Sequence, residues 1–134
     1  MSGPALAELA ALPGPAGCLT GAGEPEAARS DMSRSGTALP LAICHRHRLG
    51  VVPQGGMTGL AGGANPGADT VALSLARLSG IEEIDRQSMS MTLRAGTVLQ
   101  AAQEAAEAAG LMVPLDLGAR GSCQIGGNIA TNAG

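Results

Sequence analysis

The stretch that decides the fold class of this 134-residue sequence is Pro114-Leu-Asp-Leu-Gly-Ala-Arg-Gly-Ser-Cys-Gln-Ile-Gly-Gly-Asn-Ile-Ala-Thr-Asn-Ala-Gly134. It sets five glycines among short hydrogen-bonding side chains. Glycine lets a backbone approach a ligand without a Cβ in the way, and successive N–H groups can face an anion. The stretch therefore suits a polar, flat or phosphorylated ligand, although a turn-rich surface loop explains it about equally well when it is taken alone.

A second glycine-rich segment, Pro53-Gln-Gly-Gly-Met-Thr-Gly59, continues to Gly63 and follows the apolar run 49–53. Two such segments, each led by proline and each following a strand or helix, favour a binding site over two unrelated surface loops. The dinucleotide fingerprint Gly-x-Gly-x-x-Gly is absent, because Glu26 stands where the third glycine after Gly21-Ala-Gly23 belongs.

Hydrophobic periodicity predicts an α+β chain. Helical spacing predicts a helix over 4–12 and another from Thr97 to Ala109, with Thr97 and Gln100 as a capping box and Gly110 as the stop. The second helix is expected to be buried on a wide face and to carry one polar stripe, formed by Gln100, Gln103, Glu104 and Glu107. Residues 15–40 show neither helical nor strand period and are expected to be irregular, with the end of a helix at 41–48.

A short buried strand is predicted at 49–53. Strands with one apolar face are predicted at 70–75, where Val71, Leu73 and Leu75 alternate with other residues, and at 91–95. A strand with poorer alternation is predicted at 81–85, and 86–90 is expected to be the turn of a hairpin.

The composition excludes several functions. The sequence has no Phe, Trp or Tyr, its eight basic residues are all Arg, and its net charge is −3, so it offers neither a basic footprint nor stacking platforms for nucleic acid. Without Lys it can form neither the Gly-x4-Gly-Lys phosphate loop nor a Schiff base. No apolar run reaches the ~18 residues of a membrane span, and no basic flank precedes the first apolar residues, so a cytoplasmic location is expected.

No metal site is expected. Cys18, Cys44 and Cys123 are widely spaced, and Cys44-His-Arg-His47 is better explained as a solvated helix end, since a structural zinc site needs four ligands. Cys123 is expected to be a small buried residue, and Arg120 to pair with a phosphate, pair with Asp116 or lie free on the surface.

The two glycine-rich segments, with Leu73-Ser-Leu, Ile84-Asp85 and Ala95-Gly96 between them, resemble the FAD-binding domain of the vanillyl-alcohol oxidase and para-cresol methylhydroxylase (PCMH) family. Within that family the sequence is most similar to the FAD-linked D-2-hydroxyacid dehydrogenases, which act on lactate, glycolate or 2-hydroxyglutarate. The resemblance runs from about Leu41 to Gly134. It implies an incomplete PCMH-type FAD-binding domain over 41–134, comprising a small α/β subdomain and the start of an antiparallel one, after an N-terminal helix and irregular segment over 1–40.

The resemblance also implies roles for individual residues. Those of the first segment would hold the FAD pyrophosphate through the backbone, and those of the second would line the cofactor and approach its isoalloxazine and ribityl portions. Non-covalent FAD would accept a hydride from a small 2-hydroxy acid and pass electrons to a separate acceptor; no catalytic residue is assigned in this chain. The implied cofactor-binding residues are Pro53, Gln54, Gly55, Gly56, Met57, Thr58, Gly59, Pro114, Asp116, Gly118, Gly121, Ser122, Gly126, Gly127, Asn128, Thr131 and Asn132.

The sequence departs from the family pattern at three places. Met57 stands where relatives carry Asn or, in covalent flavoproteins, His, which excludes covalent attachment there. Met89 replaces a turn glycine and is expected to strain a hairpin that needs positive φ. The family's first strand is missing or replaced, so the strand at 51–53 is expected to have an unpaired edge. A truncated, non-catalytic remnant and a split nucleotide-binding module that needs a partner chain are therefore alternatives to part of a working dehydrogenase.

Overall fold

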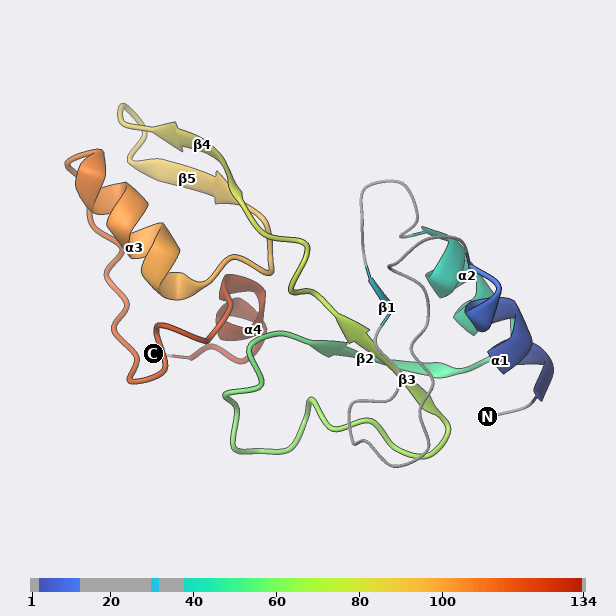
Figure 1. The fold of residues 1–134 in the computed structure, drawn as a ribbon. Coiled ribbons are helices and arrows are strands. Elements are labelled where there is room, and N and C mark those ends of the chain that lie inside the picture. Colours follow the sequence, from blue (N-terminus) through green and yellow to red (C-terminus); the bar gives the residue numbers. More distant parts are fainter. Residues whose placement is uncertain (1–2, 13–29, 32–37, 134) are drawn as a thin grey trace. The chain divides into compact units, whose positions relative to one another are not determined.

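The computed structural model describes residues 3–12, 30–31 and 38–133 (Figure 1). They fall into two units, the first made of residues up to Gln54 together with Gly59–Arg77, and the second of Gly55–Thr58 together with Leu78 onward. Cys18, Gly134 and most of the stretch predicted to be irregular lie outside the described residues.

The first unit is a small parallel sheet with two helices. The sheet has the order β1-β3-β2, formed by Ser30–Asp31, Thr70–Ser74 and Gly50–Gln54. The helices are α1 (Gly3–Ala10) and α2 (Ala38–Arg46), which lie side by side in Figure 1. Leu9 of α1, Ile43 and Cys44 of α2 and Val71 of β3 form the core of this unit.

Three predictions for the first unit need correction. The stretch 15–40 is not irregular throughout, because β1 and the first turn of α2 lie within it. Strand β3 does not bury one face only: Val71, Ala72 and Leu73 are all buried, since β3 is the central strand. Strand β2 is not fully buried, because it lies at an edge and its two valines are only partly buried.

The unpaired edge of β2 is confirmed for the described part of the chain. There β2 pairs with β3 alone, over the register Gly50–Thr70 to Gln54–Ser74. Strand β1 joins the opposite side of β3 and does not cover that edge.

The second unit contains an antiparallel hairpin and two helices. Strands β4 (Ile81–Asp85) and β5 (Ser90–Leu93) pair with an irregularity between Ile81 and Glu83, as the poor alternation of this run predicts. Met89, in the turn, has φ of 52°, so the predicted positive φ is confirmed. The hairpin is followed by α3 (Leu99–Ala108) and α4 (Ile125–Ala130).

Helix α3 has the predicted polar stripe and ends as predicted. Leu99, Ala102 and Ala106 are buried, whereas Gln100, Glu104 and Glu107 are exposed. Gly110 has φ of 76°, its N–H donates to the Glu107 carbonyl, and the Leu111 N–H donates to the Ala106 carbonyl. These two bonds form a Schellman motif, for which glycine is the favoured residue.

The predicted capping box at the start of α3 is wrong. The N-cap residue is Val98, and no side chain caps the helix. Thr97 Oγ1 instead accepts from the Gly80 N–H at 3.0 Å and donates to the Gly80 carbonyl at 3.1 Å, while Gln100 Nε2 donates to Glu104. Thr97 thus ties the segment before the hairpin to the start of α3.

Candidate functional site

Residues 55–58 of the first glycine-rich segment belong to the second unit, where they meet the second glycine-rich segment. A Cβ added to Gly56 would lie 1.9 Å from the carbonyl oxygen of Ser122, and one added to Gly55 would lie 3.3 Å from Oε1 of Gln124. Only glycine permits the first approach, because real Cβ contacts are never that short. The structure therefore brings Gly55 and Gly56 against residues 122–124, two parts of the sequence that were predicted to share a site.

The second segment is held in place by backbone hydrogen bonds to the start of α3. The Leu99 and Gln100 N–H groups, which no earlier turn can satisfy, donate to the carbonyls of Cys123 and Arg120, both at 3.0 Å. The Ile125 N–H donates to the Thr97 carbonyl at 2.9 Å. The carbonyls of this loop thus take the place of an N-cap side chain, and these helix amides are not free to bind an anion.

Residues 125–130 form α4, a helix that the glycine-rich sequence does not predict. Gly126 has a structural reason to be glycine: a Cβ there would lie 2.7 Å from the Ala95 Cβ, and its N–H donates to the Ala95 carbonyl at 2.8 Å. Asn128 is buried and donates from Nδ2 to Cys123 Sγ at 3.5 Å. The expected burial of Cys123 is confirmed.

Several predicted residues leave open space beside the backbone. A Cβ added to Gly59, Gly118 or Gly127 would meet no atom within 4 Å. Nothing among the described residues requires glycine at these three positions, and each offers bare backbone to a ligand. The remaining exposed members of the predicted set are Pro53, Met57, Thr58, Pro114, Asp116, Gly121, Ser122, Thr131 and Asn132.

Gln54 belongs to the first unit, where it fixes the base of the first glycine-rich segment. Its side chain is buried, and Nε2 donates to the Ala64 carbonyl at 3.0 Å. The main-chain carbonyl of Gln54 accepts from the Leu75 N–H at 2.9 Å. The Nε2 amide and the main-chain carbonyl of Gln54 are therefore both engaged within the protein.

Asp116 and Arg120 form an exposed ion pair with Nη1 and Oδ1 3.1 Å apart. Of the interactions expected for Arg120, the structure thus shows the one with Asp116. Such an exposed pair contributes about 0–1 kcal/mol.

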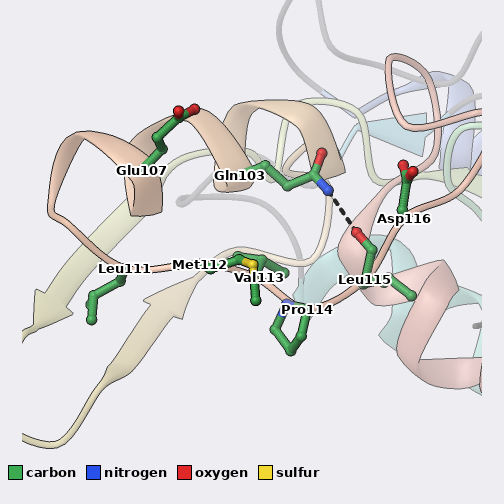
Figure 2. Close-up of a pocket in the computed structure, with 8 residues that line it drawn as sticks. All are labelled: Gln103, Glu107, Leu111, Met112, Val113, Pro114, Leu115 and Asp116. Carbon is green, nitrogen blue, oxygen red and sulfur yellow. Dashed lines mark hydrogen bonds between the residues drawn. The ribbon is translucent and has the colours of Figure 1, made fainter.

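A pocket of about 590 Å³ lies in the second unit, where residues 111–116 run alongside α3 (Figure 2). Gln103 Nε2 donates to the Leu115 carbonyl at 2.6 Å and holds this segment against the helix. Pro114 and Asp116 are the two predicted cofactor residues that line it; Gln103 and Glu107 had been expected to form only an exposed stripe. Its lining carries two carboxylates and no cation, so it is not suited to a phosphate.

Gln124 was not predicted as a site residue. It is 8% exposed, and its Oε1 is buried without a hydrogen-bond partner among the described residues. In the sequence, a glutamine among the small residues of a glycine-rich segment is only a weak indication of a binding residue. Its place beside the first glycine-rich segment is revealed by the tertiary contact with Gly55.

The Cys44–His47 segment lies at the end of α2 in the first unit. Arg46 Nη1 lies 2.9 Å and His47 Nε2 3.3 Å from the carboxylate of Glu8 in α1, and Cys44 is buried. Within residues 3–12, 30–31 and 38–133, no three His, Cys, Asp or Glu side chains come close enough to hold a metal ion. No helix in the same residues is long and apolar enough to cross a membrane.

In a comparison with known families, residues 38–134 match the FAD binding domain. The chain belongs to this family. FAD is accordingly the cofactor, and the α+β fold with a PCMH-type FAD-binding domain is confirmed.

Curated relatives of the FAD-binding domain agree. A protein of Oryza sativa subsp. indica named "Probable D-2-hydroxyglutarate dehydrogenase, mitochondrial" is 50% identical over 94 residues, which cover 70% of this chain and 17% of the relative. The mitochondrial D-2-hydroxyglutarate dehydrogenase of Bos taurus is 47% identical over 94 residues, with the same two coverages. The chain thus spans about a sixth of the length of these relatives.

Among solved structures, alkyldihydroxyacetonephosphate synthase superposes with a TM-score of 0.69 at 18% identity, covering 78% of this chain and 20% of the other. At that identity the match concerns the fold.

The residues present fit FAD. Within the second unit, bare backbone at Gly118 and Gly127 and a buried acceptor at Gln124 without a partner among the described residues are features that a nucleotide cofactor with many hydroxyl and phosphate groups would use.

Proposed function

We propose that this FAD-binding domain belongs to a flavin-dependent dehydrogenase that oxidises a D-2-hydroxy acid of the lactate, glycolate or 2-hydroxyglutarate type. The observation that carries the proposal is the 50% identity over 94 residues to a protein named for D-2-hydroxyglutarate oxidation. When bound, FAD supplies the acceptor for a hydride from the α-carbon of the acid.

The chain's own residues bind and position the cofactor in this proposal. Backbone N–H groups of residues 55–59 hold the pyrophosphate, and residues 114–132 line the rest of the cofactor. The hydrogen bonds that fix residues 120–125 on the start of α3 support this assignment, because a loop fixed in advance loses little entropy on binding.

FAD is held without a covalent bond at residue 57 in this proposal. The Met57 side chain is half-exposed and, unlike His, supplies no nitrogen nucleophile for flavin attachment. Acid precipitation of the flavin-loaded protein should therefore release all the flavin into the supernatant, and yellow precipitate would contradict this.

A cytoplasmic location stays a prediction. The rice and cattle relatives are both named mitochondrial, and the absence of a membrane-crossing helix in the described residues does not decide between compartments.

A chimera tests the activity. Residues 38–134 would replace the aligned segment of the cattle relative, and the flavin content and the reduction of an artificial electron acceptor would be measured with D- and L-2-hydroxyglutarate, D-lactate and glycolate. The proposal predicts a yellow protein that oxidises at least one of these acids, with preference for a D enantiomer. A folded, yellow chimera that oxidises none of them would contradict the activity, and the unmodified relative is the positive control.

A further inference from the structure

Gln124 has a buried acceptor that no group in the described part of the chain uses. The side chain is 8% exposed, and its Oε1 has no hydrogen-bond donor among the described residues. The glutamines of β2 and α3 differ, since Nε2 of Gln54, Gln100 and Gln103 each donates to a carbonyl or carboxylate oxygen and none of them has a buried Oε1 without a partner. Buried polar groups in native proteins are nearly always paired, so an orphan acceptor calls for a partner.

The position of this acceptor is fixed by the backbone. Gln124 forms a β-bridge with Val98, and its carbonyl accepts from the Asn128 N–H at 3.0 Å. Its side chain lies against Gly55, where an added Cβ would come within 3.3 Å of Oε1. The orphan oxygen therefore lies where the two glycine-rich segments meet in the second unit, next to the Gly56–Ser122 contact.

We propose that Gln124 is a cofactor-binding residue, whose Oε1 accepts a hydrogen bond from an O–H or N–H group of FAD. The inference rests on the proposed FAD site. FAD offers such donors at both ends, in its ribityl and ribose hydroxyls, its flavin N–H and its adenine amino group. This hydrogen bond would place FAD next to the point at which Gly55 and Gly56 contact residues 122–124.

The experiment compares FAD affinity of the 134-residue chain with that of Gln124→Met, which keeps the length of the side chain and removes the acceptor. Loss of one hydrogen bond predicts a rise in Kd of roughly 2- to 13-fold, by flavin fluorescence titration. Gln124→Glu keeps an acceptor oxygen and should bind FAD more tightly than Gln124→Met. Gln87→Met, in the exposed hairpin turn, is the control and should leave Kd unchanged.

Thermal melting without FAD separates binding from structure. An acceptor that lacks a donor in the free protein destabilises it, so Gln124→Met should leave the Tm of the cofactor-free chain unchanged or raise it while it weakens FAD binding. A structural hydrogen bond would instead show as a lower Tm without FAD, and that result would overturn the proposal.

Two further ligands locate the donor. Weaker binding of FMN by Gln124→Met places it on the ribityl or flavin part, and weaker binding of ADP places it on the adenosine part; either result supports the proposal. If the unaltered chain binds FAD and Gln124→Met binds it equally well, the proposal fails and the FAD site stands. If the unaltered chain does not bind FAD, both fail.

Discussion

Gly56 is the residue at which the fold tolerates a side chain least. A Cβ there would meet the Ser122 carbonyl oxygen at 1.9 Å and Cys123 Cα at 3.0 Å, both of which are backbone atoms that cannot rotate away. Gly56→Ala should therefore separate the two glycine-rich segments and lower the free energy of unfolding by about 1–3 kcal/mol, the usual cost of overpacking. Urea unfolding measures this, with Gly63→Ala, which meets no atom within 4 Å, as the control. Equal stability of the two variants would show that the segments do not touch.

Met89 is strained where a glycine would not be. Its φ of 52° lies in the left-handed region, which costs a residue with a Cβ about 1–2 kcal/mol, and its side chain is 76% exposed and contributes little packing. Met89→Gly should raise the free energy of unfolding by up to about 1 kcal/mol after the entropic cost of glycine. Met112→Gly, equally exposed but without positive φ, should not be stabilising in the same denaturation assay.

Among elements, the connection between the β4–β5 hairpin and α3 depends on Thr97. Its hydroxyl satisfies both the N–H and the carbonyl of Gly80, and the residue is 3% exposed. Thr97→Val keeps the shape but leaves the Gly80 N–H unpaired, while the Gly80 carbonyl still accepts from the Arg94 N–H at 2.9 Å, so it should cost about 1–3 kcal/mol of stability. Thr92→Val, on the exposed side of β5, should cost much less. Similar melting temperatures for the two variants would contradict this role.

The β4–β5 turn should respond to acid. The Ser88 hydroxyl and the Ser88 and Gln87 N–H groups all donate to the Asp85 carboxylate, which lowers the pKa of Asp85 below 3.8. Because the folded-state pKa is the lower one, the stabilisation is complete above about pH 4 and is lost as the pH falls through the folded value. In an NMR titration the Ser88 amide should shift below pH 3.8, and Asp85→Asn should abolish the shift. A midpoint above 3.8 would contradict the hydrogen-bonded turn.

Local pattern was enough to predict α3, the Gly110 stop and the three strands β3, β4 and β5. It failed where distant groups decide the outcome. Helix α4 was not predicted because it contains two glycines, each of which is about 1 kcal/mol unfavourable in a helix. Its first N–H groups, those of Ile125 and Gly126, donate to the distant carbonyls of Thr97 and Ala95. Thr97 was predicted to cap α3, but its hydroxyl bonds to Gly80 instead. Because Gly80 is 17 residues away in the sequence, local pattern could not reveal this bond.

The sequence was enough to predict that the two glycine-rich segments form the candidate site, but it did not predict which of their residues come into contact. The approach of Gly56 to Ser122 and the unpaired oxygen of Gln124 depend on tertiary structure alone. Glycine at 126 looked like a ligand contact in the sequence, yet packing against Ala95 already requires it.

At the scale of the whole molecule, we expect the chain to bind FAD. It belongs to the FAD-binding family, and residues 55–56 contact residues 122–124 within one unit. A ligand that binds only the folded state adds about 2.7 kcal/mol to the free energy of unfolding at a concentration of 100 Kd.

The most direct measurement is a series of urea unfolding curves of the 134-residue chain at rising FAD concentration, with riboflavin as the control ligand that lacks the pyrophosphate. The account predicts that the unfolding midpoint rises with the logarithm of FAD concentration and much less with riboflavin. A midpoint that is indifferent to FAD up to millimolar concentration would contradict it.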